Sequence, residues 1–201
     1  DFRKLGSSSH SYGSIVNDGW QAGGAIRTQG SSFSSGKRVE QGIGMHANAL
    51  ITFDIDEIRK AGLLPSDQSF KFKVDRAGIN DDTLGSNGSS HVAVLVTRPH
   101  KDKAVSDAVL AAFVNGKPVE VDVDDFTYYF SGDPGEPIRA DGKFVSFDIP
   151  IPPEAKHLTL VTTGASEPDD NPISSDHAVF SGARLELDPL PEEKLAAKDD
   201  A

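Results

Sequence analysis

Hydrophobic and polar residues alternate along much of the middle of the chain, with the period of two that is typical of strands having one buried and one solvated face. In five segments, three apolar residues at alternate positions are separated by polar ones. These segments are residues 51–55, 70–74, 119–123, 145–149 and 183–187. Each segment therefore predicts a strand with one face in a core.

Other segments are more continuously apolar and predict strands that are covered on both faces. Residues 92–96 and 158–162 have this pattern and are predicted to be central strands. Residues 109–114 form a further predicted strand, and Asn115-Gly116 follows it directly. Asn-Gly after an apolar run is a strong hairpin signal, because both residues tolerate positive φ.

Helical patterns are scarce in this sequence. Residues 56–64 predict one short helix, with Asp56 as its N-cap and Gly62 near its end. The predicted strands are separated by loops rich in Gly, Pro, Asn and Asp. The predicted fold class is therefore all-β, an antiparallel β-sandwich or jelly roll with at most one or two short helices.

Composition divides the chain into three parts. The first part, residues 1–38, is rich in Ser, Gly and Gln, and we expect it to be an irregular lead-in that packs on the sandwich. The sandwich itself is predicted for residues 39–188. The last part, residues 189–201, is predicted to be a polar tail or linker. Two loops, residues 80–90 and 124–143, are longer than a sandwich needs. Long loops carry function more often than sandwich faces do.

The charge and the residues that are missing narrow the possible functions. The formal net charge is −11, which disfavours nucleic acid and anionic membranes as partners but suits neutral ligands and hard cations. The same charge is also consistent with a role in solubility alone.

The absence of cysteine excludes disulfides and thiolate-bound zinc. We expect no membrane-spanning helix, because no apolar run reaches about 18 residues. The chain begins at Asp1 without a signal peptide, so we interpret it as a piece of a longer protein.

Catalytic motifs are not evident in the sequence. Asp176 and His177 are adjacent, but neighbouring residues on a strand point to opposite faces, and no Gly-x-Ser-x-Gly elbow accompanies them. There is no His-Glu-x-x-His motif, phosphate-binding loop or dinucleotide fingerprint, and the six histidines lack zinc-ligand spacing. The sequence therefore favours a protein that is not an enzyme.

Three blocks of the chain resemble the NPCBM family of carbohydrate-binding modules, in the order that the family has them. The first is the run Gly-Ile-Gly-Met-His-Ala at residues 42–47 with the strand that follows it, and the second is the strand 70–74 with its acidic turn. The third contains Ser-Asp-His-Ala at residues 175–178 and the last strand. The blocks span residues 42–187. The chain departs from the family at Val179-Phe180, where the family often has Asp-Trp.

The resemblance implies a galactose-binding-like β-sandwich that acts as a non-catalytic carbohydrate-binding module of a larger bacterial protein. Such a protein is secreted, periplasmic or exposed at the cell surface. The implied partners are a glycan, with galactose-containing glycans favoured, and catalytic or other domains of the same parent chain. The alternative is a structural or protein-interaction sandwich without sugar affinity, since the fold does not settle function. A hydrated cluster of His, Asp and aromatic residues favours the first hypothesis, and a flat exposed apolar patch favours the second.

The candidate sugar-binding residues combine imidazoles, a carboxylate and aromatic rings. His46 and His177 are predicted on neighbouring strands, where an imidazole beside Asp176 can orient sugar hydroxyls. Trp20, Tyr128 and Tyr129, with Phe126 beside them in the sequence, are candidate platforms for the apolar face of a sugar. Each of these residues also has a purely structural interpretation: the histidines as buried groups that fix the fold, and the aromatic residues as packing.

A structural calcium ion is a further expectation from the resemblance. The turn Asn17-Asp18-Gly19 is similar to the Asp-Gly turn of galactose-binding-like modules, in which a Glu on the last strand completes the ion's shell. The predicted ligands are therefore Asp18 and Glu186, and oxygen ligands of this kind suit calcium. The acidic turn Asn80-Asp81-Asp82 is a rival calcium site. The alternative is that both turns are solvated and bind no ion.

Overall fold

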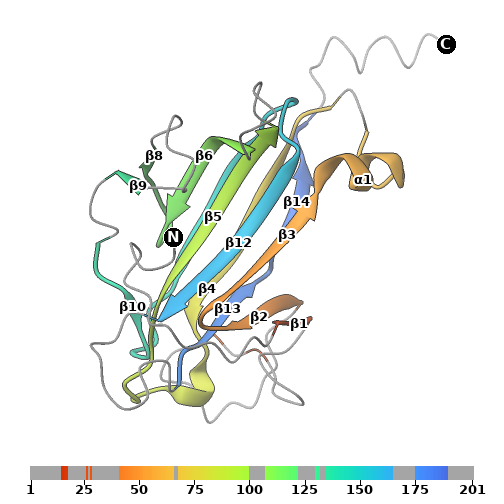
Figure 1. The fold of residues 1–201 in the computed structure, drawn as a ribbon. Helices are drawn as coiled ribbons and strands as arrows, with labels where there is room; N and C mark the ends of the chain where they lie inside the picture. Colours follow the sequence, from red (N-terminus) through yellow and green to blue (C-terminus); the bar gives the residue numbers. More distant parts are fainter. Residues whose placement is uncertain are drawn as a thin grey trace, which may run out of the picture.

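The computed structural model of this chain is an antiparallel β-sandwich of two six-stranded sheets, with a separate two-stranded ribbon at one side (Figure 1). It describes residues 15–17, 26, 28, 41–65, 68–99, 107–121, 130–131, 135–164 and 175–189. The described helices are one short α-helix and one 3₁₀ helix. The predicted all-β fold class is confirmed.

The two sheets are built from strands that are far apart in sequence. The first sheet has the order β1 (Ile15–Asn17), β2 (Gly42–His46), β13 (His177–Ser181), β4 (Phe70–Ile79) and β11 (Val145–Ile151), and β14 (Arg184–Leu187) also pairs with β4. The second sheet has the order β3 (Ala49–Asp54), β12 (His157–Gly164), β5 (Ser89–Pro99), β6 (Asp107–Val114) and β7 (Lys117–Pro118), and β10 (Ile138–Arg139) also pairs with β5. The ribbon pairs β8 (Glu120–Val121) with β9 (Phe130–Ser131).

The central strands of the second sheet are buried on both faces, as their continuous apolar sequence predicts. On β5, Val92, Val94 and Val96 belong to the main core between the sheets. The alternate residues Ala93 and Leu95 belong to a second cluster on the opposite face. That cluster also contains Ala112, Val114 and Val161 from the two neighbouring strands. The segment 119–123, in contrast, contributes only the two-residue strand β8 in the described residues.

The predicted hairpin after β6 is confirmed. Asn115 and Gly116 both have positive φ, at 50° and 78°, as the favoured two-residue hairpin turns require. The Asn115 side-chain oxygen also accepts a hydrogen bond from the Val92 amide at 3.1 Å. The turn is therefore fixed to the neighbouring strand β5 as well as to its own hairpin.

The short helix α1 (Ile55–Lys60) begins earlier than the sequence predicts. Its N-cap is Asp54, whose side chain accepts the Glu57 amide at 3.0 Å, so the prediction of Asp56 as the cap is wrong. Asp54 still pairs with His157 in the sheet and has extended backbone dihedrals, which is the conformation that an N-cap needs. Gly62, with φ of 73°, follows the helix. No helix in the described residues is long and apolar enough to cross a membrane.

The described part of the lead-in lies against the first sheet. Strand β1 pairs with β2, and the buried side chain of Ile26 approaches Gly42. A Cβ atom at Gly42 would lie 2.7 Å from the Phe180 carbonyl oxygen and 2.9 Å from Ile26 Cδ1. Close packing therefore accounts for this glycine.

Candidate functional site

His46 and His177 lie directly opposite each other on the neighbouring strands β2 and β13. Their ring centroids are 5.1 Å apart, and the rings meet edge to face at 61°. Their neighbours Met45 and Ala178 are also paired and belong to the main core. Because successive residues of a strand point to opposite faces, both imidazoles point away from the core.

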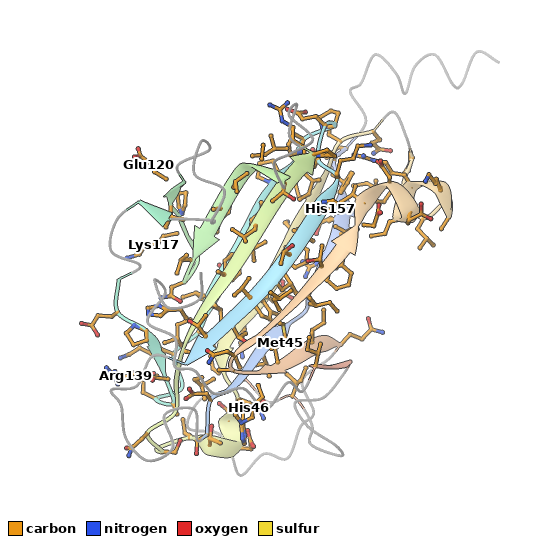
Figure 2. The ribbon with its side chains drawn as sticks, in the orientation of Figure 1. Met45, His46, Lys117, Glu120, Arg139 and His157 are labelled. Carbon is orange, nitrogen blue, oxygen red and sulfur yellow. The ribbon has the colours of Figure 1, made fainter. Side chains whose placement is uncertain are left out.

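The histidine pair lies at the end of the sandwich where the β2–β3 turn meets the turn that follows β4 (Figure 2 labels His46). His46 is 5% exposed, and the His177 side chain is 14% exposed. Asn48, in the β2–β3 turn, accepts a hydrogen bond from the Gly164 amide at 2.8 Å. The site is therefore a largely buried polar cluster that is held by connections between the strands, and the His177 side chain keeps some exposure.

The carboxylate beside His177 belongs to Asp82, in the 3₁₀ helix Asp81–Thr83. Asp82 Oδ2 lies 2.8 Å from His177 Nδ1, and its other oxygen accepts from Asn80 Nδ2 at 2.5 Å. The Asn80 amide donates to the His177 carbonyl oxygen at 2.8 Å. The acidic turn is therefore bound to β13 through both backbone and side-chain atoms.

These contacts set the hydrogen-bonding polarity of the two rings. His46 Nδ1 lies 3.0 Å from the Ala47 carbonyl oxygen, which can only accept, so Nδ1 carries the hydrogen. Burial lowers the pKa of His46; the nearby His177 lowers it further, while the Ala47 carbonyl and Asp82 partly oppose the shift. In the neutral ring, Nε2 is then an acceptor. The ionised Asp82 carboxylate can only accept, so His177 Nδ1 carries the hydrogen that it donates to Asp82.

Asp176 occupies a different position from the one expected for a residue that contacts the ligand. Its side chain is fully buried, and Oδ1 accepts the Ser89 amide at 2.6 Å. Its carbonyl oxygen accepts from the amides of Ala47 and Ala178 at 3.2 and 2.9 Å. Asp176 therefore supports the histidine strands from inside the protein.

Sequence reasoning did not identify Asp82 as the partner of His177, although it noted the acidic turn as a rival calcium site. The signal was present in the order of the strands. Strand β4 pairs with β13 and ends at Ile79, which lies opposite Ala178. Residues just after Ile79 must therefore lie near His177, but this inference requires the pairing to be known.

The predicted aromatic platforms Trp20, Tyr128 and Tyr129, with Phe126, and the predicted calcium ligand Asp18 lie outside the described residues. Their roles stay predictions. Of the predicted sugar site, the structure places the histidine pair and Asp176.

The other predicted calcium ligand, Glu186, is exposed on β14 and lies between two cations. Its carboxylate oxygens are 3.2 Å from Lys73 Nζ and 3.4 Å from Arg184 Nε, and the hydrogen bond from Lys73 is the largest cause of its lowered pKa. In the described part of the chain, no group of three or more His, Asp or Glu residues is arranged to hold a metal. The surroundings of Glu186 therefore fit an ion-pair network, and a calcium ion there stays a prediction.

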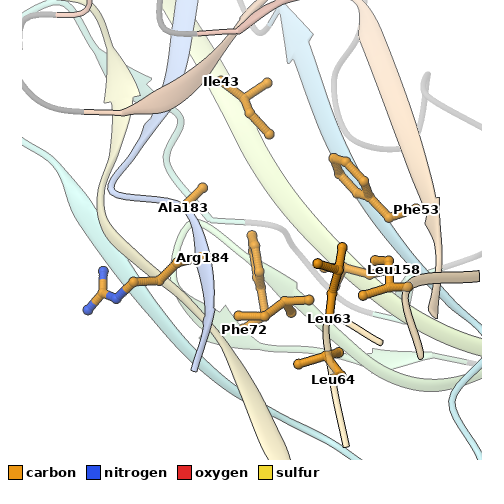
Figure 3. Close-up of a pocket in the computed structure, with 10 residues that line it drawn as sticks. Ile43, Phe53, Leu63, Leu64, Phe72, Leu158, Ala183 and Arg184 are labelled. Carbon is orange, nitrogen blue, oxygen red and sulfur yellow. The ribbon is translucent and has the colours of Figure 1, made fainter. Parts of the chain in front are cut away.

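An apolar groove lies between the two sheets at their β3 and β14 edges (Figure 3). It encloses a cavity of about 350 Å³. Phe53 and Leu158 line it from the second sheet, and Phe72 and Leu185 line it from the first. Leu63, after helix α1, also lines the groove and is 72% exposed. This groove is separate from the histidine pair, which points away from the core.

No family model and no curated protein sequence matches this chain. Its fold is similar to that of several solved carbohydrate-binding modules of the CBM51 type. One is the CBM51 from Clostridium perfringens GH95 in complex with methyl-galactose, with 21% identity, a TM-score of 0.53, and coverage of 90% of this chain and 91% of that chain. The tandem CBM51 modules of Sp3GH98, a family 98 glycoside hydrolase from Streptococcus pneumoniae SP3-BS71, give 18% identity, a TM-score of 0.53, and coverage of 92% and 46%.

A third similar structure contains CBM51-2 in complex with GlcNAc and INT domains, from Clostridium perfringens ZmpB. It shows 17% identity and a TM-score of 0.54, and the match covers 96% of this chain and 32% of that chain. At these identities the similarity is one of fold. The NPCBM resemblance noted in the sequence stays a resemblance.

Proposed function

We propose that this chain is a non-catalytic carbohydrate-binding module whose sugar site is centred on His46 and His177. The observation that carries the proposal is the pairing of these two imidazoles on adjacent strands, 5.1 Å apart, at a partly exposed end of the sandwich. Asp82 and Asn80 complete a polar cluster of the kind that recognises hydroxyl groups.

The chemistry of the cluster suits a sugar with several hydroxyl groups. Imidazole nitrogens can donate or accept hydrogen bonds, and hydroxyl groups can do the same. Because the pair lies at an end of the sandwich and only a small part of the His177 side chain is exposed, we propose that the end or a side branch of a glycan reaches it. Binding of this kind needs no chemical step, and it would hold an attached protein near its glycan by raising the local concentration.

The solved structures of similar fold support the choice of ligand and parent protein. One of them is in complex with methyl-galactose, another is in complex with GlcNAc, and a third belongs to a glycoside hydrolase. We therefore propose a neutral galactose- or GlcNAc-containing glycan as the ligand. The parent in our proposal is a larger extracellular bacterial protein, which carries an enzyme domain acting on the same glycans.

The test is a calorimetric titration of the chain with methyl-galactoside and with GlcNAc, together with a glycan array. We expect saturable binding to at least one neutral sugar, loss of that binding in His177→Ala, and retained binding in His157→Ala. His157 is a matched control, because it lies at the start of β12, at the other end of the sandwich (Figure 2). Absence of binding to the array and to both sugars would contradict the proposal.

A second candidate function, protein interaction, is favoured by the apolar groove. An exposed Leu63 above a cavity of about 350 Å³ is the type of feature that marks contact surfaces. If Leu63→Lys abolished the association of this chain with other domains of its parent while sugar binding persisted, the groove would be an interaction site separate from the sugar site. Such a result would add a function to the module without replacing the first.

A further inference from the structure

We infer that a pocket beside β10 is a second saccharide subsite, in which Phe144 offers an aromatic surface and Arg139 offers hydrogen-bond donors to a neutral sugar. The inference takes its ligand class from the proposed function and adds a site that is separate from the histidine pair. The pocket is lined by residues 136–139, 141 and 143–145 and encloses about 470 Å³. Small-molecule sites typically enclose roughly 300–1,000 Å³. Figure 2 shows Arg139 and His46 at the same end of the sandwich.

The pocket lies where the two long loops of the chain, residues 80–90 and 124–143, meet each other. The Ala140 amide donates to the Gly88 carbonyl oxygen at 2.9 Å, and the Ala140 carbonyl oxygen accepts from the Gly85 amide at 2.7 Å. The loop 80–90 also carries the acidic turn that contacts the histidine pair. This loop therefore borders both sites, as expected if the two long loops together carry binding.

The backbone around the pocket is held on two sides. On one side, Arg139 lies opposite Ser89 in the pairing of β10 with β5, and the Glu136 carbonyl oxygen accepts from Asn115 Nδ2 at 3.0 Å. On the other side, β11 begins at Val145 and pairs with β4. Because both sides are fixed to strands of the sandwich, a ligand would not have to order the backbone, which lowers the entropic cost of binding.

The Phe144 ring is seated against the backbone of β4 and keeps part of its surface exposed. A Cβ atom at Gly78 would lie 3.1 Å from Phe144 Cδ1 and 3.0 Å from Ile138 Cγ2, so the glycine makes room for both side chains. Ile138 belongs to the main core, whereas Phe144 lines the pocket. The ring therefore offers a fixed apolar surface, and the apolar face of a sugar ring packs on such surfaces.

Charged side chains of both signs surround this aromatic ring. Glu136 and Arg139 are exposed, and Asp141 Oδ2 accepts from Lys143 Nζ at 2.7 Å. The two cations and two anions of the pocket lining balance, which favours a neutral ligand over an ionised one. A guanidinium has five N–H donors and a carboxylate has two acceptor oxygens, so sugar hydroxyl groups can find both kinds of partner. An aromatic surface among donors and acceptors is the combination that suits a neutral saccharide.

The test is a titration of the ¹⁵N-labelled chain with methyl-galactoside and with GlcNAc, followed by the NMR shifts of assigned backbone amides. With at least one of these sugars, we expect saturable shifts at the amides of Arg139 and Phe144. The same shifts should persist in His177→Ala, because the pocket does not include the histidine pair.

Two variants and a matched control test the roles of the side chains. Arg139→Ala should weaken binding at the pocket on the order of tenfold, because a charged donor is lost, and should leave the melting temperature unchanged, because the residue is exposed. Phe144→Leu keeps an apolar side chain against Gly78 but removes the flat ring, so it should also weaken binding. Arg98→Ala removes the same side chain as Arg139→Ala near the other end of β5 and should leave the affinity unchanged.

The outcomes separate this inference from the proposed function. If the sugars shift only amides around the histidine pair, the second subsite is overturned and the proposed function stands. If they shift only amides of the pocket, the subsite is supported and the histidine-centred site is overturned. Equal affinities of Arg139→Ala and Arg98→Ala would overturn the role of Arg139. If neither sugar shifts any amide, both sites are overturned.

Discussion

The carboxylate of Asp176 accepts the backbone amide of Ser89 at 2.6 Å, although 87 positions separate the two residues. Asp176 immediately precedes β13 of the first sheet, and Ser89 begins β5 of the second. The bond therefore links the two layers of the sandwich at the end that carries the histidine pair. Both residues are fully buried, so water does not compete for this contact.

Replacing Asp176 should destabilise the protein and disturb the histidine site, because Asp176 directly precedes His177 and anchors the start of β13. In Asp176→Ala, the buried Ser89 amide loses its acceptor, which we expect to cost about 1–3 kcal/mol of unfolding free energy. Asp176→Asn retains an acceptor oxygen and should cost less than Asp176→Ala. Urea denaturation of the three proteins measures the difference, and equal stability of the alanine variant and the wild type would contradict this role.

The burial of His46 predicts that the protein loses stability on acidification. The pKa of His46 is lowered from its ordinary value of 6.5, mainly because burial disfavours the charged ring. Above that value, neither the folded nor the unfolded chain binds a proton there. As the pH falls below 6.5 toward the lowered folded-state value, the unfolded chain takes up a proton that the folded chain does not.

The contribution of His46 to the unfolding free energy is therefore fully present above its unfolded-state pKa, and it is lost as the pH falls below that value. The loss is at most about 1.4 kcal/mol for each pH unit in that window. Urea denaturation at pH 7.5 and at pH 5 should show a smaller decrease for His46→Gln than for the wild type. An identical pH dependence in the two proteins would show that His46 is not the titrating group.

Replacing His46 and replacing His177 should affect stability and sugar binding to different degrees. His46 is almost completely buried, so His46→Ala should lower the unfolding free energy by about 1–3 kcal/mol and weaken sugar binding as well. His177 is more exposed, so His177→Ala should lose binding with a smaller change in melting temperature. Thermal melts and sugar titrations on both variants test this division. Unchanged melting and binding in both would refute a role for the pair.

The position of Gly42 allows a test of close packing at the start of β2. In Gly42→Ala, the new methyl group would lie 2.7 Å from the Phe180 carbonyl oxygen, which is backbone and cannot move away easily. We expect a loss of about 1–3 kcal/mol. The control is Gly62→Asn, because Gly62 has a φ of 73° with open space around it, and asparagine tolerates that conformation. A loss in Gly62→Asn as large as that in Gly42→Ala would contradict the packing argument.

The strands were predictable from the sequence because alternation records which face of a strand is buried. The patterns at residues 70–74, 145–149 and 183–187 correspond to parts of β4, β11 and β14. The hairpin at Asn115-Gly116 was predictable from neighbouring residues as well, because few residue pairs accept positive φ at both positions. The start of α1 was missed by two residues, because Asp54 and Asp56 are both acceptable caps and only the sheet pairing of Asp54 distinguishes them.

The sequence by itself determined that this protein is an all-β sandwich and that His46 and His177 belong to distinctive segments, since both properties depend on neighbouring residues. Only the tertiary structure decided that Asp82, and not the adjacent Asp176, is the carboxylate hydrogen-bonded to His177. Neighbouring residues on a strand point in opposite directions, so the residue next to His177 in the chain is buried while one 95 positions away reaches its ring. The register between β4 and β13, which is set by long-range packing, brings that carboxylate into place.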